Sequence, residues 1–229
     1  MPKTPDRPIL CYVTDRKSLP VDDPITSLSH CIERAIHAGI TWIQIREKDF
    51  PTRELLTLSA EVIAVARKSA QETRTRIILN DRLDVALAAA AGGVHLGHAS
   101  APARDVISWC RAGNAPKNFT IGVSCHSLDD VRNAENSGAD YVFFGPVFDT
   151  PSKRALGTPQ GIEQLTAICA VAKIPVIAIG GVDESNAGEC LRAGAAGIAA
   201  IRFFQGVTDG EILKSKVQKL LQTQSKVSR

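Results

Sequence analysis

The sequence predicts an α/β fold, a single (β/α)8 TIM barrel domain that spans residues 1–229. Eight short apolar runs alternate with longer amphipathic segments, an order typical of a parallel sheet with right-handed crossovers. Eight such units in 229 residues fit a closed barrel. An open doubly wound sheet is the alternative, but the first run continues into Thr14-Asp15-Arg16 and not into a Gly-x-Gly-x-x-Gly turn. The barrel is therefore the preferred prediction.

The expected strands are continuous apolar runs of the kind found in strands covered on both faces, and Val176-Ile177-Ala178-Ile179 is the clearest example. In chain order, strands are expected at residues 9–14, 42–46, 76–80, 93–96, 120–124, 141–145, 175–179 and 197–201. Helices are expected at about residues 25–38, 52–70, 82–90, 102–112, 128–137, 161–172, 184–193 and 210–222. We expect flexible ends at residues 1–8 and about 223–229.

Residues that favour helix ends support these bounds. Ser127 and Asp183 stand directly before expected helices, where a short polar side chain caps the first turn. Pro51-Thr52 stands at the start of another helix. Glycines follow three helices at positions where a left-handed residue ends them: Gly39, Gly138 and Gly194.

Composition narrows the classes of partner. Charged residues make up 22%, the formal net charge is +3 and no basic stretch is interleaved with aromatic residues, so nucleic acid is not expected. The chain has no apolar signal core and no apolar run of membrane-spanning length, so we expect a cytoplasmic protein that does not bind membranes. Six scattered cysteines without a Cys-x-x-Cys pair suit reduced thiols. A homo-oligomer is compatible with the sequence, which leaves the oligomeric state open.

Polar residues gather where the expected strands end, which is the face that carries active sites in this fold. Gln44, Arg46 and Lys48 alternate along one strand, so we expect them to form a ladder on one face. An amide, a guanidinium and an ammonium in a row suit a ligand with several anionic oxygens.

Other strand ends offer metal-binding and proton-transfer groups. Asp81, beside Asn80, is a candidate Mg²⁺ ligand, since Mg²⁺ takes few carboxylates and shares phosphate oxygens with a substrate; a helix cap ahead of Leu83 is the alternative. His95 and His98 lack a third ligand nearby in sequence, so a metal is not expected there. His126, which follows Ser124, is better placed for ligand contact or proton transfer.

The last strands offer phosphate-binding groups. Gly180-Gly181 lets backbone N–H groups approach phosphate oxygens, together with the turn at Ile201-Arg202. Arg202 adds a charge-assisted contact there, or pairs with an outer carboxylate. After the sixth strand, Lys153 can neutralise a leaving phosphate, and hydroxyls are available from Thr150 and Ser152.

Taken together, six motifs resemble the thiamine-phosphate synthase family, which includes a thiazole-tautomerase branch. The resemblance covers almost the whole chain, from Tyr12 to Ala195. Its motifs are Gln44-Ile45-Arg46-Glu47-Lys48, Asn80-Asp81-Arg82, Gly93-Val94-His95-Leu96-Gly97, Gly122-Val123-Ser124-Cys125-His126, Gly145-Pro146-Val147-Phe148 with Thr150 and Lys153, and Ala178-Ile179-Gly180-Gly181.

The resemblance implies that 4-amino-2-methyl-5-pyrimidinylmethyl diphosphate and a thiazole phosphate condense to thiamine phosphate and pyrophosphate, through a pyrimidine methyl cation. It implies that the pyrimidine diphosphate is held by Gln44, Arg46, Lys48, Asn80, Ser124 and Lys153. It implies that the thiazole phosphate is held by Thr150, Ser152, Gly181, Ile201 and Arg202. Asp81 would bind the Mg²⁺ cofactor, and the expected catalytic set is Arg46, Lys48, Lys153, Ser124 and His126.

Two departures keep other readings open. Ser100 stands where synthases of the family place a second Mg²⁺-binding aspartate, and a neutral hydroxyl is the poorer ligand. Arg202 replaces a small residue of the thiazole-phosphate turn. The alternatives are therefore a thiazole tautomerase, which would use a histidine at the position of His126, and a non-catalytic barrel that binds a phosphorylated ligand.

Overall fold

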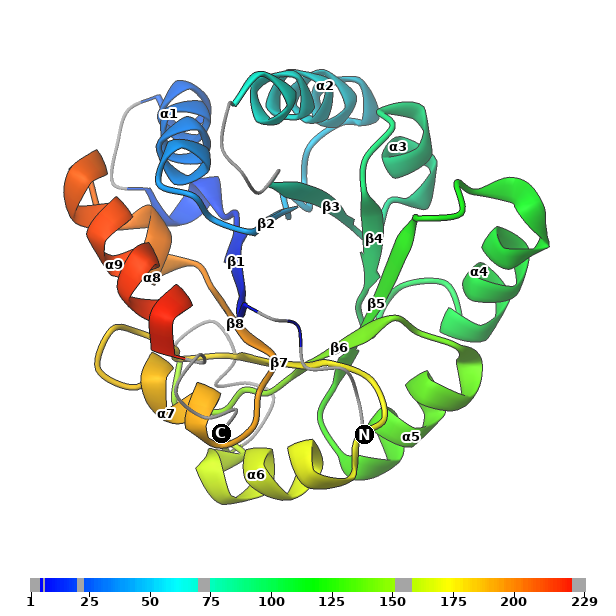
Figure 1. Ribbon diagram of the computed structural model, residues 1–229. Helices are drawn as coiled ribbons and strands as arrows, with labels where there is room; N and C mark the ends of the chain where they lie inside the picture. Colours follow the sequence, from blue (N-terminus) through cyan, green and yellow to red (C-terminus); the bar gives the residue numbers. More distant parts are fainter. Residues whose placement is uncertain (1–4, 6, 20–22, 70–74, 151–157, 224–229) are drawn as a thin grey trace.

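The computed structural model describes residues 5, 7–19, 23–69, 75–150 and 158–223. Eight parallel strands form a closed barrel in chain order, and β1 pairs with both β2 and β8, which confirms the predicted fold (Figure 1). The strands are β1 (Ile9–Val13), β2 (Trp42–Ile45), β3 (Arg76–Asn80), β4 (Gly93–Leu96), β5 (Thr120–Cys125), β6 (Tyr141–Phe144), β7 (Val176–Ile179) and β8 (Gly197–Ala200).

Helices surround the barrel as an outer layer (Figure 1). They are α1 (Pro24–His37), α2 (Thr52–Lys68), α3 (Leu83–Ala88), α4 (Ala103–Trp109), α5 (Leu128–Ser137), α6 (Gly161–Val171), α7 (Ala187–Arg192), α8 (Arg202–Gln205) and α9 (Gly210–Thr223). A 3₁₀ turn (Arg16–Ser18) follows β1, and a π-helical turn (Cys110–Asn114) extends α4. The short helix α8 was not expected from the sequence.

The expected helix ends are confirmed in most places. The Ser127 hydroxyl accepts a hydrogen bond from the backbone N–H of Asp130 (3.1 Å) and caps α5. The three expected glycines have left-handed φ values of 86° at Gly39, 87° at Gly138 and 98° at Gly194. Each ends the helix before it at no steric cost.

The expected cap at Asp183 is wrong. Its carboxylate accepts hydrogen bonds from the backbone N–H (2.8 Å) and hydroxyl (2.6 Å) of Ser185, while its own N–H donates to Asn186 Oδ1 (2.9 Å). These contacts build a separate turn, so α7 begins at Ala187 and not at residue 184. Asp and Asn side chains form such local turns in competition with a helix.

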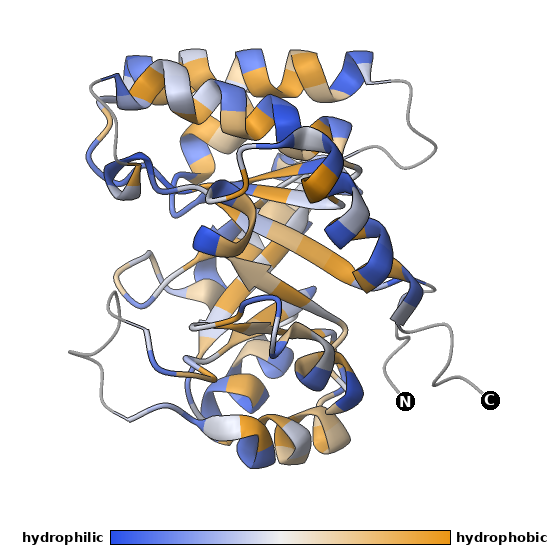
Figure 2. Ribbon diagram, turned by 90° about the vertical axis from the view of Figure 1, so that its left-hand side faces the viewer, coloured by the Kyte–Doolittle hydropathy of each residue, from blue (hydrophilic) through white to orange (hydrophobic). Residues whose placement is uncertain are grey.

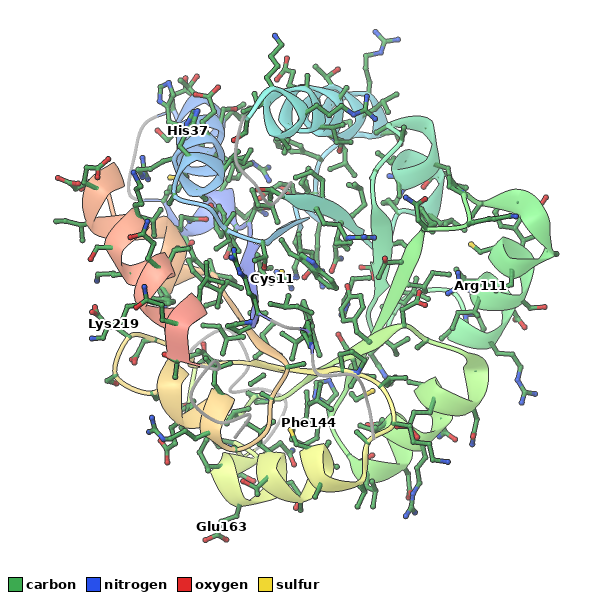
Figure 3. The ribbon with its side chains drawn as sticks, in the orientation of Figure 1. Cys11, His37, Arg111, Phe144, Glu163 and Lys219 are labelled. Carbon is green, nitrogen blue, oxygen red and sulfur yellow. The ribbon has the colours of Figure 1, made fainter. Side chains whose placement is uncertain are left out.

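The apolar core has two parts. The larger part lies between the strands and the outer helices, and Figure 2 shows hydrophobic residues along the strands while the helices carry both kinds. The smaller part lies inside the barrel, where Figure 3 shows Cys11 near the centre and Glu163 and Lys219 pointing outward. The inner cluster consists of Cys11, Val13, Tyr141, Phe143, Ile177 and Ala199. A packed interior leaves the strand ends as the place for chemistry.

Among the described helices, none has the length and apolar character needed to cross a membrane. All six cysteines are free thiols; five are buried and Cys169 is half-buried.

Candidate active site

The loop after β2 carries two cations beside a buried amide. Gln44 is 2% exposed, and its Nε2 donates to Asn80 Oδ1 (2.8 Å) on the neighbouring strand β3. Strand β2 ends at Ile45, one residue before the expected end, and Lys48 lies in a turn, so the expected strand spacing does not extend to Lys48. Arg46 follows directly, with its backbone N–H on the Thr14 hydroxyl (2.9 Å), and is half-buried, whereas Lys48 lies exposed in the next turn.

Arg16 anchors this loop from the opposite side. Its guanidinium donates to the Glu47 carboxylate (3.0 Å), whose side chain is 1% exposed. It also makes two hydrogen bonds of 2.7 Å each to Asp49 and lies 4.1 Å above the Phe50 ring. The hydrogen bonds from Arg16 hold the pKa of the Asp49 carboxyl below its usual range. The sequence analysis did not identify Arg16. The available signal was Glu47, an acidic residue between Arg46 and Lys48 that calls for a basic partner.

Asp81 belongs to a chain of polar side chains that joins three strand ends. Asn80 Nδ2 donates to Asp81 Oδ2 (2.6 Å), and Asp81 Oδ1 accepts from the backbone N–H of Gly97 (3.0 Å) and from the Ser100 hydroxyl. A carboxylate can only accept, so Asn80 must turn its NH₂ to Asp81 and its oxygen to Gln44. Asp81 therefore sets the orientation of both amides.

The alternative role of Asp81 as a helix cap is wrong. The residue that precedes α3 is Arg82, and no side-chain hydrogen bond caps that helix. Asp81 instead has a left-handed φ of 61°, which directs its carboxylate to the loop after β4. Such a φ is uncommon for a residue other than glycine and is found at active sites, although Asp adopts it more readily than most.

The oxygen atoms of Asp81 and Ser100 fit as ligands of a Mg²⁺ ion that is held by one carboxylate. Asp81 Oδ1 accepts two hydrogen bonds, but Oδ2 accepts one and retains a free lone pair. The Ser100 oxygen accepts from Gly97 N (2.7 Å), which also leaves it one lone pair. Within the described ranges no group of three or more His, Cys, Asp and Glu side chains could hold a metal. This set suits an ion that takes its remaining ligands from water and substrate phosphates.

Two histidines face the ends of β4 and β5. His95 Nε2 lies 2.9 Å from the hydroxyl of the half-buried Ser124. His126 Nδ1 bonds to the Gly145 carbonyl oxygen, which can only accept, so Nδ1 carries a proton, and in the neutral imidazole Nε2 is the nitrogen with the lone pair. Burial raises the pKa of the neighbouring Cys125 thiol to about 12, so that group stays protonated and is not a nucleophile.

The opposite side of the barrel offers a tight glycine turn after β7. Gly180 and Gly181 have φ values of 94° and 66°. A Cβ atom on Gly181 would lie 2.6 Å from the carbonyl oxygen of Asp149 and 2.7 Å from the Cβ of Phe148. The turn therefore packs directly on the loop after β6, which carries the buried Thr150 (8% exposed). Ser152 and Lys153 lie outside the described residues.

The turn after β8 is a neighbour of this glycine turn in the barrel order. Ile201 is half-buried and precedes α8, and Arg202 is exposed. None of the described carboxylates forms an ion pair with Arg202.

Gln205, at the end of α8, is a second residue that the sequence did not indicate. It is 5% exposed; its Oε1 accepts from the Tyr12 hydroxyl (2.7 Å) and its Nε2 donates to the Asp15 carbonyl (2.9 Å) and the Ser18 hydroxyl (2.8 Å). These bonds tie the turn after β8 to the loop after β1. The sequence analysis did not predict helix α8, and for that reason it gave no role to Gln205.

Known proteins resemble this chain along most of its length. The sequence model of a family described as thiamine monophosphate synthase matches residues 10–204. A putative thiamine-phosphate synthase of Geobacter sulfurreducens is 42% identical over 84% of each chain. The thiamine-phosphate synthase of Chlorobium limicola is 37% identical over 95% of this chain and 96% of its own. The solved structure of a thiamine phosphate pyrophosphorylase from Pyrococcus furiosus superposes with a TM-score of 0.78 at 33% identity, covering 93% of this chain and 95% of that one.

Proposed function

Because the chain belongs to the thiamine monophosphate synthase family, we propose that it condenses 4-amino-2-methyl-5-pyrimidinylmethyl diphosphate with a thiazole phosphate to form thiamine phosphate and pyrophosphate. The observation that carries the proposal is the chain of side chains Gln44–Asn80–Asp81–Ser100. This chain places the Asp81 carboxylate, which can bind a cation, next to the loop that holds Arg46 and Lys48. A diphosphate needs both kinds of group.

The pyrimidine diphosphate is assigned to the ends of β2, β3 and β5 in this proposal. Arg46 and Lys48 neutralise its phosphate oxygens, and Lys153 adds a third cation from the loop after β6. Gln44 and Asn80 orient the substrate through amides whose direction Asp81 sets. Asp81, with the hydroxyl of Ser100, would hold Mg²⁺, which when bound supplies positive charge to the leaving pyrophosphate.

The thiazole phosphate is assigned to the opposite side of the barrel. The N–H groups of the turn at Gly181 and of the turn at Ile201-Arg202 are the proposed donors to its oxygens. The guanidinium of Arg202, without an ion pair among the described residues, adds a charge-assisted contact. Thr150 and Ser152 supply hydroxyls from the loop after β6.

The reaction then requires little proton transfer. The bond between the pyrimidine methylene carbon and the diphosphate oxygen breaks, its electron pair leaves with pyrophosphate, and a resonance-stabilised pyrimidine methyl cation remains. The lone pair of the thiazole nitrogen forms the new C–N bond. The task of the protein is to neutralise the leaving group and to hold two reactants in line. A site rich in cations, in which Cys125 stays protonated, supports this assignment.

The purified protein tests the proposal directly. With both substrates and saturating Mg²⁺, we expect thiamine phosphate and pyrophosphate in equal amounts, measured by chromatography. Omission of the thiazole phosphate is expected to abolish thiamine phosphate formation. Absence of thiamine phosphate in the complete mixture would overturn the proposal.

Ser100→Asp is expected to tighten divalent metal binding by about 10-fold or more, since a second carboxylate replaces a neutral hydroxyl beside Asp81. Titration with Mn²⁺, followed by electron paramagnetic resonance without substrate, measures this affinity. Ser127→Asp is the matched control, because Asp also caps a helix and Ser127 lies at the start of α5. Equal affinities of wild type and Ser100→Asp would show that residue 100 is not part of the metal site.

A second candidate reaction is the isomerisation of a thiazole carboxylate phosphate. It is supported by His126, whose Nδ1 is bound to the Gly145 carbonyl while Nε2 keeps a lone pair that can accept a proton. Incubation of the protein with this substrate alone, followed by NMR, tests it. Turnover that His126→Gln abolishes would support this activity, and no turnover by the wild type would eliminate it.

We also propose that the protein works in the cytoplasm. The support is that its six cysteines are free and five of them are buried. Free buried thiols are usual in a reducing compartment.

A further inference from the structure

Three polar side chains on adjacent strands form a line on the inner face of the barrel that ends at Ser124. His95 on β4 is 1% exposed; its Nε2 lies 2.9 Å from the Ser124 hydroxyl and its Nδ1 lies 3.1 Å from the Tyr141 hydroxyl. Tyr141 on β6 is also 1% exposed. The line therefore runs from a buried phenol, through a buried imidazole, to a half-buried hydroxyl on β5.

The strand between the two rings makes room for this line. Gly122 on β5 pairs with His95 on one side and with Tyr141 on the other. A Cβ atom at Gly122 would lie 2.0 Å from Tyr141 Cζ, so the ring of Tyr141 occupies the space of the missing side chain. Phe143 fixes the imidazole plane, with ring centroids 4.1 Å apart. The His95 ring is thus held in one orientation.

The direction of the hydrogen bonds follows from Tyr141. Its hydroxyl has one hydrogen-bond partner among the described residues, His95 Nδ1. Burial raises its pKa well above the usual value, so it keeps its proton. If Nδ1 carried the imidazole proton, the buried phenol hydrogen would lose its acceptor, which is costly. Tyr141 therefore donates to Nδ1, and the proton of the neutral imidazole lies on Nε2.

This direction decides what Ser124 can do. Nε2–H donates to the Ser124 oxygen, so the hydroxyl hydrogen of Ser124 is not used within the line. It remains available for an acceptor that is not part of the line. With the opposite tautomer, Ser124 would donate to His95 and present only lone pairs, which repel an anion.

We propose that Tyr141 and His95 are positioning residues that make Ser124 a hydrogen-bond donor toward a diphosphate oxygen of the pyrimidine substrate. This inference rests on the proposed function for the identity of that substrate. The tautomer of His95 does not depend on it. The two can therefore be tested separately.

The tautomer is measured on the protein without substrate. In protein labelled with ¹⁵N-histidine, the two-bond N–H correlations of His95 distinguish the two tautomers, and the signals are assigned by their loss in His95→Gln. We expect the Nε2–H tautomer. An Nδ1–H tautomer in the wild type would overturn the proposal, whether or not the protein forms thiamine phosphate.

A double-mutant cycle measures whether Tyr141 acts through Ser124. We expect Ser124→Ala to raise the KM for the pyrimidine diphosphate about 10-fold, as for one lost bond to a charged group. Tyr141→Phe, which keeps the ring and its packing, is expected to raise it about 3-fold or more, with the KM for the thiazole phosphate unchanged. The double variant is expected to match Ser124→Ala alone. If the increases in KM of the two single variants multiply in the double variant, and each variant unfolds at the wild-type temperature, Tyr141 does not act through Ser124 and the proposal is overturned.

Discussion

Asp81→Asn is expected to lower kcat/KM for the condensation by roughly 10²- to 10³-fold, equivalent to about 3–4 kcal/mol of transition-state stabilisation. The substitution removes the only negative charge that faces Asn80, Gly97 and Ser100 in the described structure. It also places a second amide opposite Asn80 Nδ2, so the orientation of Asn80 and Gln44 is no longer fixed. Steady-state kinetics at several Mg²⁺ concentrations measure the loss, which we expect to be only partly recovered at high Mg²⁺.

Asp84→Asn is the matched control for this variant. Asp84 lies three residues further along, is exposed, and pairs with Arg82 (2.6 Å) on the surface. Its substitution is expected to leave kcat/KM within about 2-fold, because an exposed ion pair contributes little to the site. Equal activity of Asp81→Asn and wild type would remove Asp81 from the proposed machinery.

Glu47→Ala is expected to lower the free energy of unfolding by about 3 kcal/mol and to raise the KM for the pyrimidine diphosphate about 10-fold. The Glu47 side chain is 1% exposed and accepts from both the guanidinium and the backbone N–H of Arg16. Removing it leaves Arg16 without its buried partner. The loop that carries Arg46 and Lys48 then loses its buried anchor to the loop after β1 and keeps the exposed one between Arg16 and Asp49. Chemical denaturation measures the first effect, and steady-state kinetics measure the second.

Two further variants make this result specific. Glu47→Gln keeps the volume and can still accept from Arg16, so we expect a smaller loss of stability than for Glu47→Ala. Glu33→Ala, at an exposed position of α1, is expected to change stability by less than about 0.5 kcal/mol. An unchanged unfolding midpoint for Glu47→Ala, or a KM effect confined to the thiazole phosphate, would contradict the anchoring role.

The order and the ends of the strands could be predicted from local composition. Continuous runs such as Val176–Ile179 are bounded by residues that do not continue a strand, and no strand end differs from expectation by more than one residue. The helix before Gly138 could also be predicted, because its cap residue Ser127 and its final glycine are local signals. Here local preference and the fold agree.

Features that depend on tertiary partners could not be predicted in this way. Arg16 and Glu47 are 31 residues apart, and Tyr12 and Gln205 are 193 residues apart, so nothing local marks either pair. The predicted start of α7 at residue 184 is wrong because hydrogen bonds of the Asp183 side chain form a turn in place of the first helical turn. The line from Tyr141 to Ser124 depends on the space beside Gly122, which only the barrel register reveals.

We propose that the diphosphate and the monophosphate bind to two separate halves of the strand-end face. A crystal structure of the protein with thiamine phosphate, pyrophosphate and Mg²⁺ tests it most directly. We expect pyrophosphate against Arg46 and Lys48 with the metal on Asp81, and the phosphate of thiamine phosphate on the turns at Gly181 and Ile201-Arg202. Pyrophosphate bound at the glycine turn, or both groups bound on one side of the barrel, would contradict the claim.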